Sequence, residues 1–281
     1  MSPFVPFIGV AALALPAPGA RAVYGGSTRA GDAIVVNANR SATKARSVVI
    51  AWEAECGSGM TITHSDVLRA APFSPLGAGR PVLGMTRNRN GRFAGKQLDA
   101  GTLDGGESVG VTVTMRGKLS RARASGTLAV SVVVRDPSGA ALDACRATTS
   151  WRASRAAGRI YGGSTSQREP LVIRLNRART TATDVMLDWQ SATCTPDDFV
   201  SFGEHFRLFP VSASGVFGAS FRQSYPTDGG GQDDYAYQLR GKIGRLRAHG
   251  TFRATATSKD DSGAMMESCD SAPLTWSATT G

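Results

Sequence analysis

Seven basic side chains form the strongest chemical signal in this sequence. They fall into two groups in the first half of the chain, three arginines close together and four basic residues around a predicted hairpin. Residues 23–157 contain 18 Lys and Arg against 9 Asp and Glu, whereas residues 158–281 contain 13 of each. A basic surface of this kind attracts polyanions, and the binding weakens as salt rises. We therefore predict a site for an anionic wall polymer or an acidic glycan, formed by Arg87, Arg89, Arg92, Arg116, Lys118, Arg121 and Arg123.

The same arginines have a second interpretation. The chain uses 27 Arg and only 5 Lys, so a solvated basic surface without a ligand is the alternative for a composition this rich in Arg. Binding of single-stranded nucleic acid by base stacking needs aromatic side chains, and few of them are interleaved with these arginines. The sequence therefore predicts no specific recognition of nucleic acid.

An acidic, glycine-rich segment in the second half offers oxygen atoms of the kind that Ca²⁺ prefers. The segment is Asp228-Gly-Gly-Gly-Gln-Asp-Asp234, and Asp197-Asp198 and Asp260-Asp261 are further acidic pairs. The spacings of an EF-hand or a Gly-Asp repeat are absent. We interpret the segment as a hairpin turn with solubilising acids, and we predict neither a metal site nor a cofactor.

Catalytic motifs are missing from the sequence. The three histidines, His64, His205 and His249, have no counterparts between the two halves, and neither Gly-x-Ser-x-Gly nor His-Glu-x-x-His occurs. His205 follows Asp197 and Asp198 closely, which we interpret as a solvated loop. The sequence therefore predicts a protein that is not an enzyme.

A secreted hydrolase remains a second alternative, because catalytic residues concentrate on loops that local motifs do not reveal. Its residues would lie in the segment around Ser65–Gly79 or in the Thr227–Asp234 turn region.

The first residues predict export. The apolar run that ends at Leu15 is too short to span a bilayer as a helix. Ala20-Arg21-Ala22 then has the small-x-small form of a signal-peptidase site. We predict a secretion signal over residues 1–22, cleaved after Ala22, and a mature protein that is soluble outside the cytoplasm. No later segment is expected to span a membrane.

The chain repeats itself, which predicts two copies of one domain over residues 23–157 and 158–281. Val23-Tyr-Gly-Gly-Ser-Thr28 returns as Ile160-Tyr-Gly-Gly-Ser-Thr165, and the glycine pairs in these motifs are interpreted as turns. The first copy carries an insertion around Ser65–Gly79, which we expect to form a surface loop.

Alternating side chains in several segments are typical of half-buried strands. Thr127–Arg135 is such a segment, and it leads into Asp136-Pro-Ser-Gly139, which is a turn sequence. We predict an all-β fold of sequential antiparallel hairpins, with about seven or eight strands per copy. The pattern is compatible with a β-sandwich and with a small β-barrel.

The four cysteines divide two per copy. Export favours oxidation, and CxxC spacing is absent, so we predict one disulfide within each copy, Cys56–Cys145 and Cys194–Cys269. A metal pair or a catalytic thiol is the alternative. Four tryptophans lie near these cysteines at matched places, and we predict that they pack in the cores; if exposed, they would instead form a platform for a sugar. They are Trp52, Trp151, Trp189 and Trp276.

The order of motifs resembles a group of secreted proteins from high-GC bacteria. The motifs are Tyr-Gly-Gly-Ser-Thr, Trp then Cys, Gly-x-Phe, Gly-Lys-(Leu/Ile), Arg-Ala-x-Gly-Thr, Asp-x-Ser-Gly, and Cys then Trp, and both halves contain them. They are turn and core residues, so the resemblance implies a scaffold and carries no activity. The leading hypothesis is an exported, non-enzymatic β-domain protein with a binding or envelope-structural role, and acidic-polymer binding is the narrower alternative.

Overall fold

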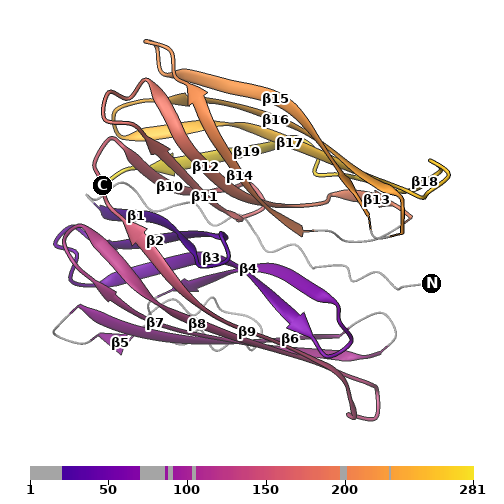
Figure 1. The fold of residues 1–281 in the computed structure, drawn as a ribbon. Coiled ribbons are helices and arrows are strands. Elements are labelled where there is room, and N and C mark those ends of the chain that lie inside the picture. The colour runs from indigo at the N-terminus through magenta and orange to yellow at the C-terminus, as the bar shows by residue number, and fades with distance from the viewer. Residues whose placement is uncertain (1–20, 70–85, 88–90, 103–105, 197–200, 228) are drawn as a thin grey trace.

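The computed structural model describes residues 21–69, 86–87, 91–102, 106–196, 201–227 and 229–281. All the regular structure in these ranges is antiparallel β-strand, arranged in two sheets that lie one above the other (Figure 1). The described part of the chain contains no helix with the length and apolar character needed to cross a membrane.

The first sheet has the order β4-β3-β2-β1-β9-β8-β7-β6-β5, and β3 also pairs with β9. Its strands are β1 (Arg21–Thr28), β2 (Ala33–Asn39), β3 (Ala45–Cys56), β4 (Thr61–Arg69), β5 (Thr86–Arg87), β6 (Arg92–Thr102), β7 (Ser108–Leu119), β8 (Arg123–Arg135) and β9 (Ala141–Ser154).

The second sheet repeats this order as β14-β12-β11-β10-β19-β17-β16-β15; β18 also pairs with β17, and β13 pairs with β18. Its strands are β10 (Ile160–Thr165), β11 (Pro170–Leu175), β12 (Thr181–Gln190), β13 (Thr193–Thr195), β14 (Ser201–Pro210), β15 (Val216–Pro226), β16 (Gln232–Ile243), β17 (Arg247–Lys259), β18 (Met265–Asp270) and β19 (Leu274–Thr279).

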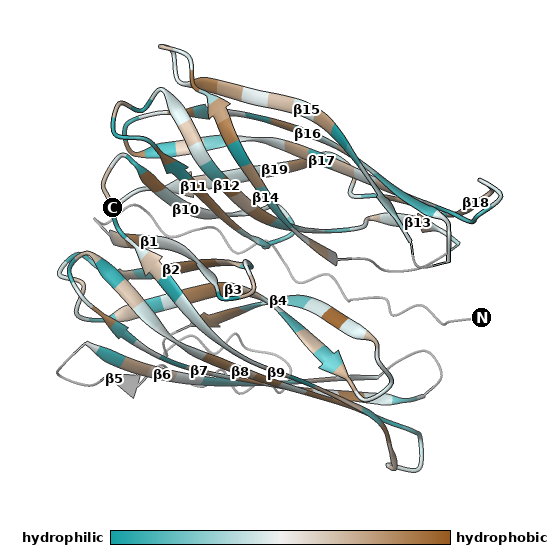
Figure 2. Ribbon diagram, viewed as in Figure 1, coloured by the Kyte–Doolittle hydropathy of each residue, from teal (hydrophilic) through white to brown (hydrophobic). Residues whose placement is uncertain are grey.

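Each sheet curls around its own hydrophobic core as a half-barrel. Buried and exposed side chains alternate along strands such as β8 and β17, so one face of the strand lies in the core and the other faces outward. Figure 2 shows hydrophobic and hydrophilic residues along the ribbons of both sheets. Hydrogen bonding is continuous through the pairing of β1 with β9, whereas β4 and β6 approach each other without a shared ladder. Gln97 of β6 bridges this seam by donating to Asp66 of β4 at 3.0 Å. The all-β prediction is confirmed, in a form between the two architectures that the sequence allowed.

The number of strands is higher than predicted: the described residues form nine in the first half-barrel and ten in the second. Short strands such as β5 and β13 carry too few residues to show a periodic pattern. The long strand β9 corresponds to two strands in the second half-barrel, because the chain breaks between β18 and β19 at Ala272, whose φ is 54°, and Pro273, which has no N–H for a ladder.

Both predicted disulfides are confirmed. Cys56 and Cys145 are directly opposite each other on β3 and β9, and Cys194 and Cys269 are opposite each other on β13 and β18. The bridges close segments with sequence separations of 89 and 75 residues. Loops of this size constrain the unfolded chain strongly, so each bridge stabilises its own half-barrel.

The four tryptophans are buried, with at most 3% of each exposed, so the prediction of core packing is confirmed and none is a platform for a sugar. The ring of Trp151 lies against two glycines that face each other on β7 and β8, Gly117 and Gly126. A Cβ at Gly117 would lie 2.4 Å from Phe93 and 2.7 Å from Trp151. The glycine in the Gly-Lys-(Leu/Ile) motif therefore makes room for an aromatic ring.

The Gly-Gly motifs lie inside strands β1 and β10, so their interpretation as turns was wrong. The second glycine of each pair lies against the neighbouring strand. A Cβ at Gly26 would be 1.9 Å from the carbonyl oxygen of Arg152, and a Cβ at Gly163 would be 1.9 Å from that of Ser277. Glycine is needed here because two backbones approach more closely than any side chain permits.

The first glycine of each pair serves the junction between the half-barrels. A Cβ at Gly25 would lie 2.7 Å from Val172 Cγ1, and a Cβ at Gly162 would lie 2.8 Å from Val35 Cγ1. The two contacts are equivalent, because the glycine of each half-barrel lies against the matched valine of the other. The isologous interface of a two-fold dimer has the same property. The apolar part of the junction consists of Val23, Ala33, Val35, Val49, Val172 and Met186.

We expect Gly162→Ala to destabilise the junction by about 1–2 kcal/mol, because the new methyl group overlaps Val35. Val35→Ala should relieve part of that overlap. In urea unfolding, the double variant should therefore be less destabilised than the sum of the two single variants, by at least about 0.5 kcal/mol. Strict additivity would contradict the contact.

Two further expectations fall partly outside the described residues. The insertion around Ser65–Gly79 was expected to be a loop, but Ser65–Arg69 belongs to β4; residues 70–79 are not described. Residues 1–20 of the predicted signal are not described either, and the predicted cleavage after Ala22 falls within β1. Ala22 itself is buried in the first core.

Candidate functional site

The pairing of β6, β7, β8 and β9 brings basic side chains from distant parts of the sequence onto one surface. Cross-strand partners point to the same side of a sheet, so the alternate residues that face outward can be read from the register. None of these outward-facing residues in the described part of the four strands is Asp or Glu. We call the surface the outer basic face; its basic residues, all exposed, are Arg92, Lys96, Arg116, Lys118, Arg123, Arg135, Arg146 and Arg152.

Like charges lie close together on this face. Arg92 is directly opposite Lys118, and the same row of cross-strand partners continues through Ser125 to Arg152. Like charges opposite each other in a sheet repel, and a bound anion would remove that cost. None of the eight basic residues forms an ion pair with an acid in the described part of the chain. Hydroxyl groups of Ser and Thr occupy many of the positions between them.

The structure places four of the seven predicted residues on the outer basic face, namely Arg92, Arg116, Lys118 and Arg123. Arg121 is exposed in the turn between β7 and β8. Arg87 lies in β5 and pairs with Phe93 of β6, and its side chain is not described. Arg89 lies outside the described residues.

Sequence reasoning missed Lys96, Arg135, Arg146 and Arg152, of which Arg135 lies in β8 on the same side as Arg123. Alternation along β6 places Lys96 on the same side as Arg92, which is a signal that could have been used. Arg146 and Arg152 belong to β9, and only the pairing of β8 with β9 brings them to the face.

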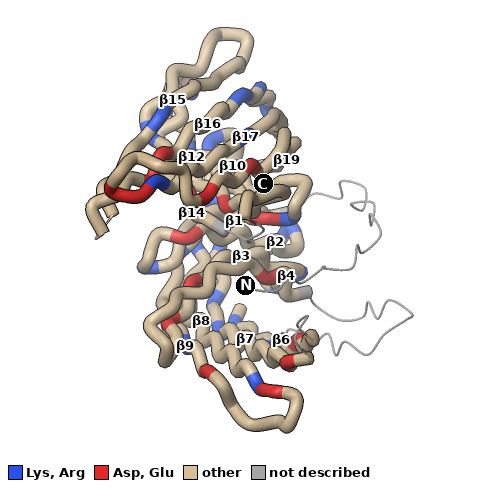
Figure 3. The backbone as a smooth tube through the Cα atoms, turned by 90° about the vertical axis from the view of Figure 1, so that its right-hand side faces the viewer, with Lys and Arg blue, Asp and Glu red and all other residues tan. Residues whose placement is uncertain are grey.

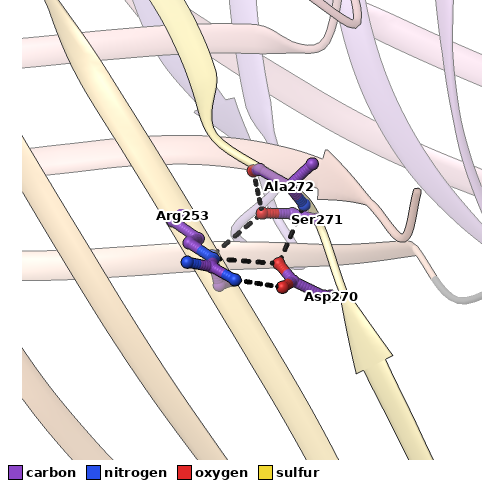
Figure 4. A network of polar contacts seen from close by, with 5 residues as sticks. Arg253, Asp270, Ser271 and Ala272 are labelled. Atoms are coloured by element: carbon purple, nitrogen blue, oxygen red, sulfur yellow. Dashed lines mark hydrogen bonds and ion pairs between the residues drawn. The ribbon is translucent and has the colours of Figure 1, made fainter. Parts of the chain in front are cut away.

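The matched face of the second half-barrel is less strongly charged. It has six basic residues, but two of them are neutralised by acids on the same face, as Arg253 pairs with Asp270 and Lys259 with Asp234. In Figure 4 the Arg253 guanidinium lies against the Asp270 carboxylate, with Nε donating to Oδ1 at 3.2 Å. The six are Arg222, Arg240, Lys242, Arg247, Arg253 and Lys259.

The acidic segments that the sequence singled out have local roles. Asp234 accepts hydrogen bonds from Lys259 and Ser224, and these hold the pKa of its carboxyl below the usual range. Asp260 caps the turn that leads to Ala264. Asp197, Asp198 and Asp228 lie outside the described residues.

His205 lies in strand β14, where a solvated loop was expected, so that interpretation was wrong. Its partner in the described part of the chain is Asp184 of β12, whose Oδ1 is 2.9 Å from His205 Nε2.

A second polar site lies at the junction, and it was not predicted from the sequence. Four acids from both half-barrels form what we call the junction acid cluster, and Figure 3 shows acidic segments on both sides of this junction. Asp188 of β12 is 1% exposed and Glu169, just before β11, is 2% exposed. Asp32 is half-buried and Glu53 is exposed at the rim. The cluster is Asp32, Glu53, Glu169 and Asp188.

Burial controls the protonation of this cluster. Removal from water raises the pKa of Glu169 to about 7, although Ser65 of β4 lowers it in part. The pKa of Asp188 is raised well above its ordinary value, first by burial and then by the charges of Glu169, Asp32, Glu204 and Glu53. Every charged group that acts on Asp188 in the described structure is acidic, so each of these charges disfavours the ionised form of its carboxyl.

Comparisons with known proteins give no family for this chain. No protein-family profile, no curated protein and no solved structure matches it. The function must therefore be argued from the two sites themselves.

Proposed function

We propose that this is an exported, non-enzymatic protein that binds an acidic extracellular polymer across the outer basic face of its first half-barrel. The observation that carries the proposal is that this face has eight basic residues and no acid among its described outward positions. A solvated surface in an Arg-rich protein would be expected to mix charges, as the second half-barrel does.

The geometry of the face suits an extended polymer better than a small ligand. Neighbouring strands are about 4.8 Å apart, and alternate residues along a strand are about 7 Å apart. The basic groups therefore lie on a shallow lattice that spans four strands. Hydroxyl groups such as those of Ser125 and Thr127 provide additional donors to sulfate, phosphate or carboxylate oxygens.

The two disulfides and the predicted signal support an extracytoplasmic location, where wall polymers and acidic glycans are the available polyanions. The resemblance to secreted proteins of high-GC bacteria points to the same location. The second half-barrel, whose outer face is partly neutralised, then acts as a partner domain that keeps the first one oriented.

We expect neutralisation of the outer basic face to reduce the salt dependence of binding. Arg116, Lys118 and Arg123 should be replaced by Gln together, and retention of the full-length protein on an immobilised acidic glycan measured as a function of salt. Each lost ionic contact should lower the slope of log affinity against log salt by about 0.7–1, so the triple variant should lose roughly two to three.

The chain offers a matched control, because Arg240, Lys242 and Arg247 take the corresponding register positions in the second half-barrel. Their replacement by Gln removes the same charge and should change the slope by less than half as much. Equal effects of the two triple variants would show that retention depends only on net charge, and the proposal would be rejected. A neutral glycan should retain none of the proteins.

A further inference from the structure

The junction acid cluster contains carboxylate oxygens that are buried without partners. Among the described residues, neither oxygen of Asp188 has a hydrogen-bond partner, and Glu169 Oε2 has none in good hydrogen-bond geometry, although the Ser65 hydroxyl is close to this carboxylate. The other oxygen of Glu169 accepts a bond from Gln190 Nε2 at 2.6 Å. Gln190 follows Asp188 by two residues on β12, so the two side chains lie on the same face of the strand. Buried polar atoms are almost always paired, and three unpaired oxygens at one place call for a physical explanation.

A glycine on the neighbouring strand leaves room for the carboxylate of Asp188. Asp188 is opposite Gly203 of β14, and a Cβ at Gly203 would lie only 2.7 Å from Asp188 Oδ1. Any larger residue at position 203 would therefore collide with the carboxylate. The matched position in the first half-barrel is Ala51, so the acid is a special feature of the second one.

The side-chain atoms that could bind a ligand at this place are all oxygens. Asp188, Glu169, Asp32 and Glu53 provide carboxylates, and Ser65 adds a hydroxyl close to Glu169. Oxygen donors without nitrogen or sulfur select hard cations, of which Ca²⁺ accepts the widest range of geometries. A cation between Asp188 and Glu169 would provide the partner that both carboxylates lack.

We propose that Asp188 and Glu169 of the second half-barrel bind a hard divalent cation, with Ca²⁺ as the best-fitting ion, where they face the first half-barrel at the junction. The described residues do not bring three carboxylates within ligand distance of one another; the groups of three that do form contain the disulfide-bonded cysteines. The ion is therefore held by two buried carboxylates, with neutral oxygens and water completing its shell.

The test uses the full-length protein and CaCl₂. After chelation with EDTA, Ca²⁺ should raise the melting temperature in a saturable way, by roughly 5–10 °C at a hundredfold excess over Kd. Equilibrium dialysis should give one bound ion per chain. Asp188→Asn and Glu169→Gln should each abolish the shift and reduce binding at least tenfold, whereas Asp261→Asn, at an exposed surface acid, should leave both unchanged.

Loss of folding does not confuse this test, because removal of a buried charge should leave the variants at least as stable as the wild type in EDTA. The proposal is overturned if dialysis finds no bound ion, or if Asp188→Asn and Glu169→Gln bind Ca²⁺ as the wild type does. A protein whose stability responds to pH but not to Ca²⁺ would also overturn it, since the pair would then be satisfied by a proton.

Discussion

In metal-free buffer, the free energy of unfolding should fall by roughly 3 kcal/mol between pH 4.5 and pH 7.5 because of Glu169 alone. Its pKa is raised from 4.5 to about 7 in the folded protein by burial. A raised pKa means that the folded state holds the proton more tightly than the unfolded state. The stability is therefore fully present below about pH 4.5 and is lost as pH rises to about 7. Asp188 acts in the same direction, because its pKa is also raised.

Urea unfolding in EDTA at closely spaced pH values measures this effect. Glu169→Gln should flatten the curve between pH 4.5 and 7.5, because the amide does not titrate. The exposed carboxyls whose pKa values are lowered, such as Asp136 and Asp260, act in the opposite direction and below this window. A wild-type curve that rises or stays flat over the same range would show that Glu169 is not buried at the junction.

Gly117→Ala should destabilise the first half-barrel by about 3 kcal/mol, at the upper end of overpacking effects. The added methyl group would lie 2.4 Å from Phe93 and 2.7 Å from Trp151, both of which are fixed in the core. Neither ring can move away without opening the sheet. Tryptophan fluorescence during urea unfolding should report the loss directly, since Trp151 is one of the rings displaced.

The same strand provides the control. Gly110 also lies in β7, but it faces outward and a Cβ there meets nothing within 4 Å. Gly110→Ala should be neutral or stabilise by up to about 1 kcal/mol, because alanine has less freedom to lose on folding. Gly241→Ala in the second half-barrel should repeat the loss, since its Cβ would lie 2.4 Å from Trp276. Equal stability of the variants at 117 and 110 would refute the argument that the ring requires glycine.

The junction between the half-barrels is symmetric in its apolar contacts but only partly symmetric in its acids. The apolar contacts exchange matched residues, such as Val35 and Val172. Asp32 and Glu169 also take matched positions, whereas Asp188 corresponds to Ala51. The outer faces differ as well, since the second carries acids that pair with Arg253 and Lys259. A symmetric arrangement of two domains thus carries different chemistry on each side.

Much of the architecture was predictable because it depends on local patterns. Alternation with a period of two identifies strands, and matched spacings assign Cys56 to Cys145 and Cys194 to Cys269. The position of the Gly-Gly motifs inside strands was not predictable, because a glycine required by a neighbouring backbone looks the same in sequence as one required by a turn. Gly25 and Gly162 are explained only by the close approach of a second domain.

The β fold, the two disulfides and the excess of positive charge in the first half could all be predicted from the sequence. The tertiary structure alone decided which charges share a surface, because strand pairing joins residues such as Arg92 and Arg152 that are far apart in the chain. It also decided that Asp188 is buried. In the sequence this acid lies between Leu187 and Trp189 in an alternating strand, and in the structure its face of β12, which also carries Met186, lies at the junction with the other half-barrel.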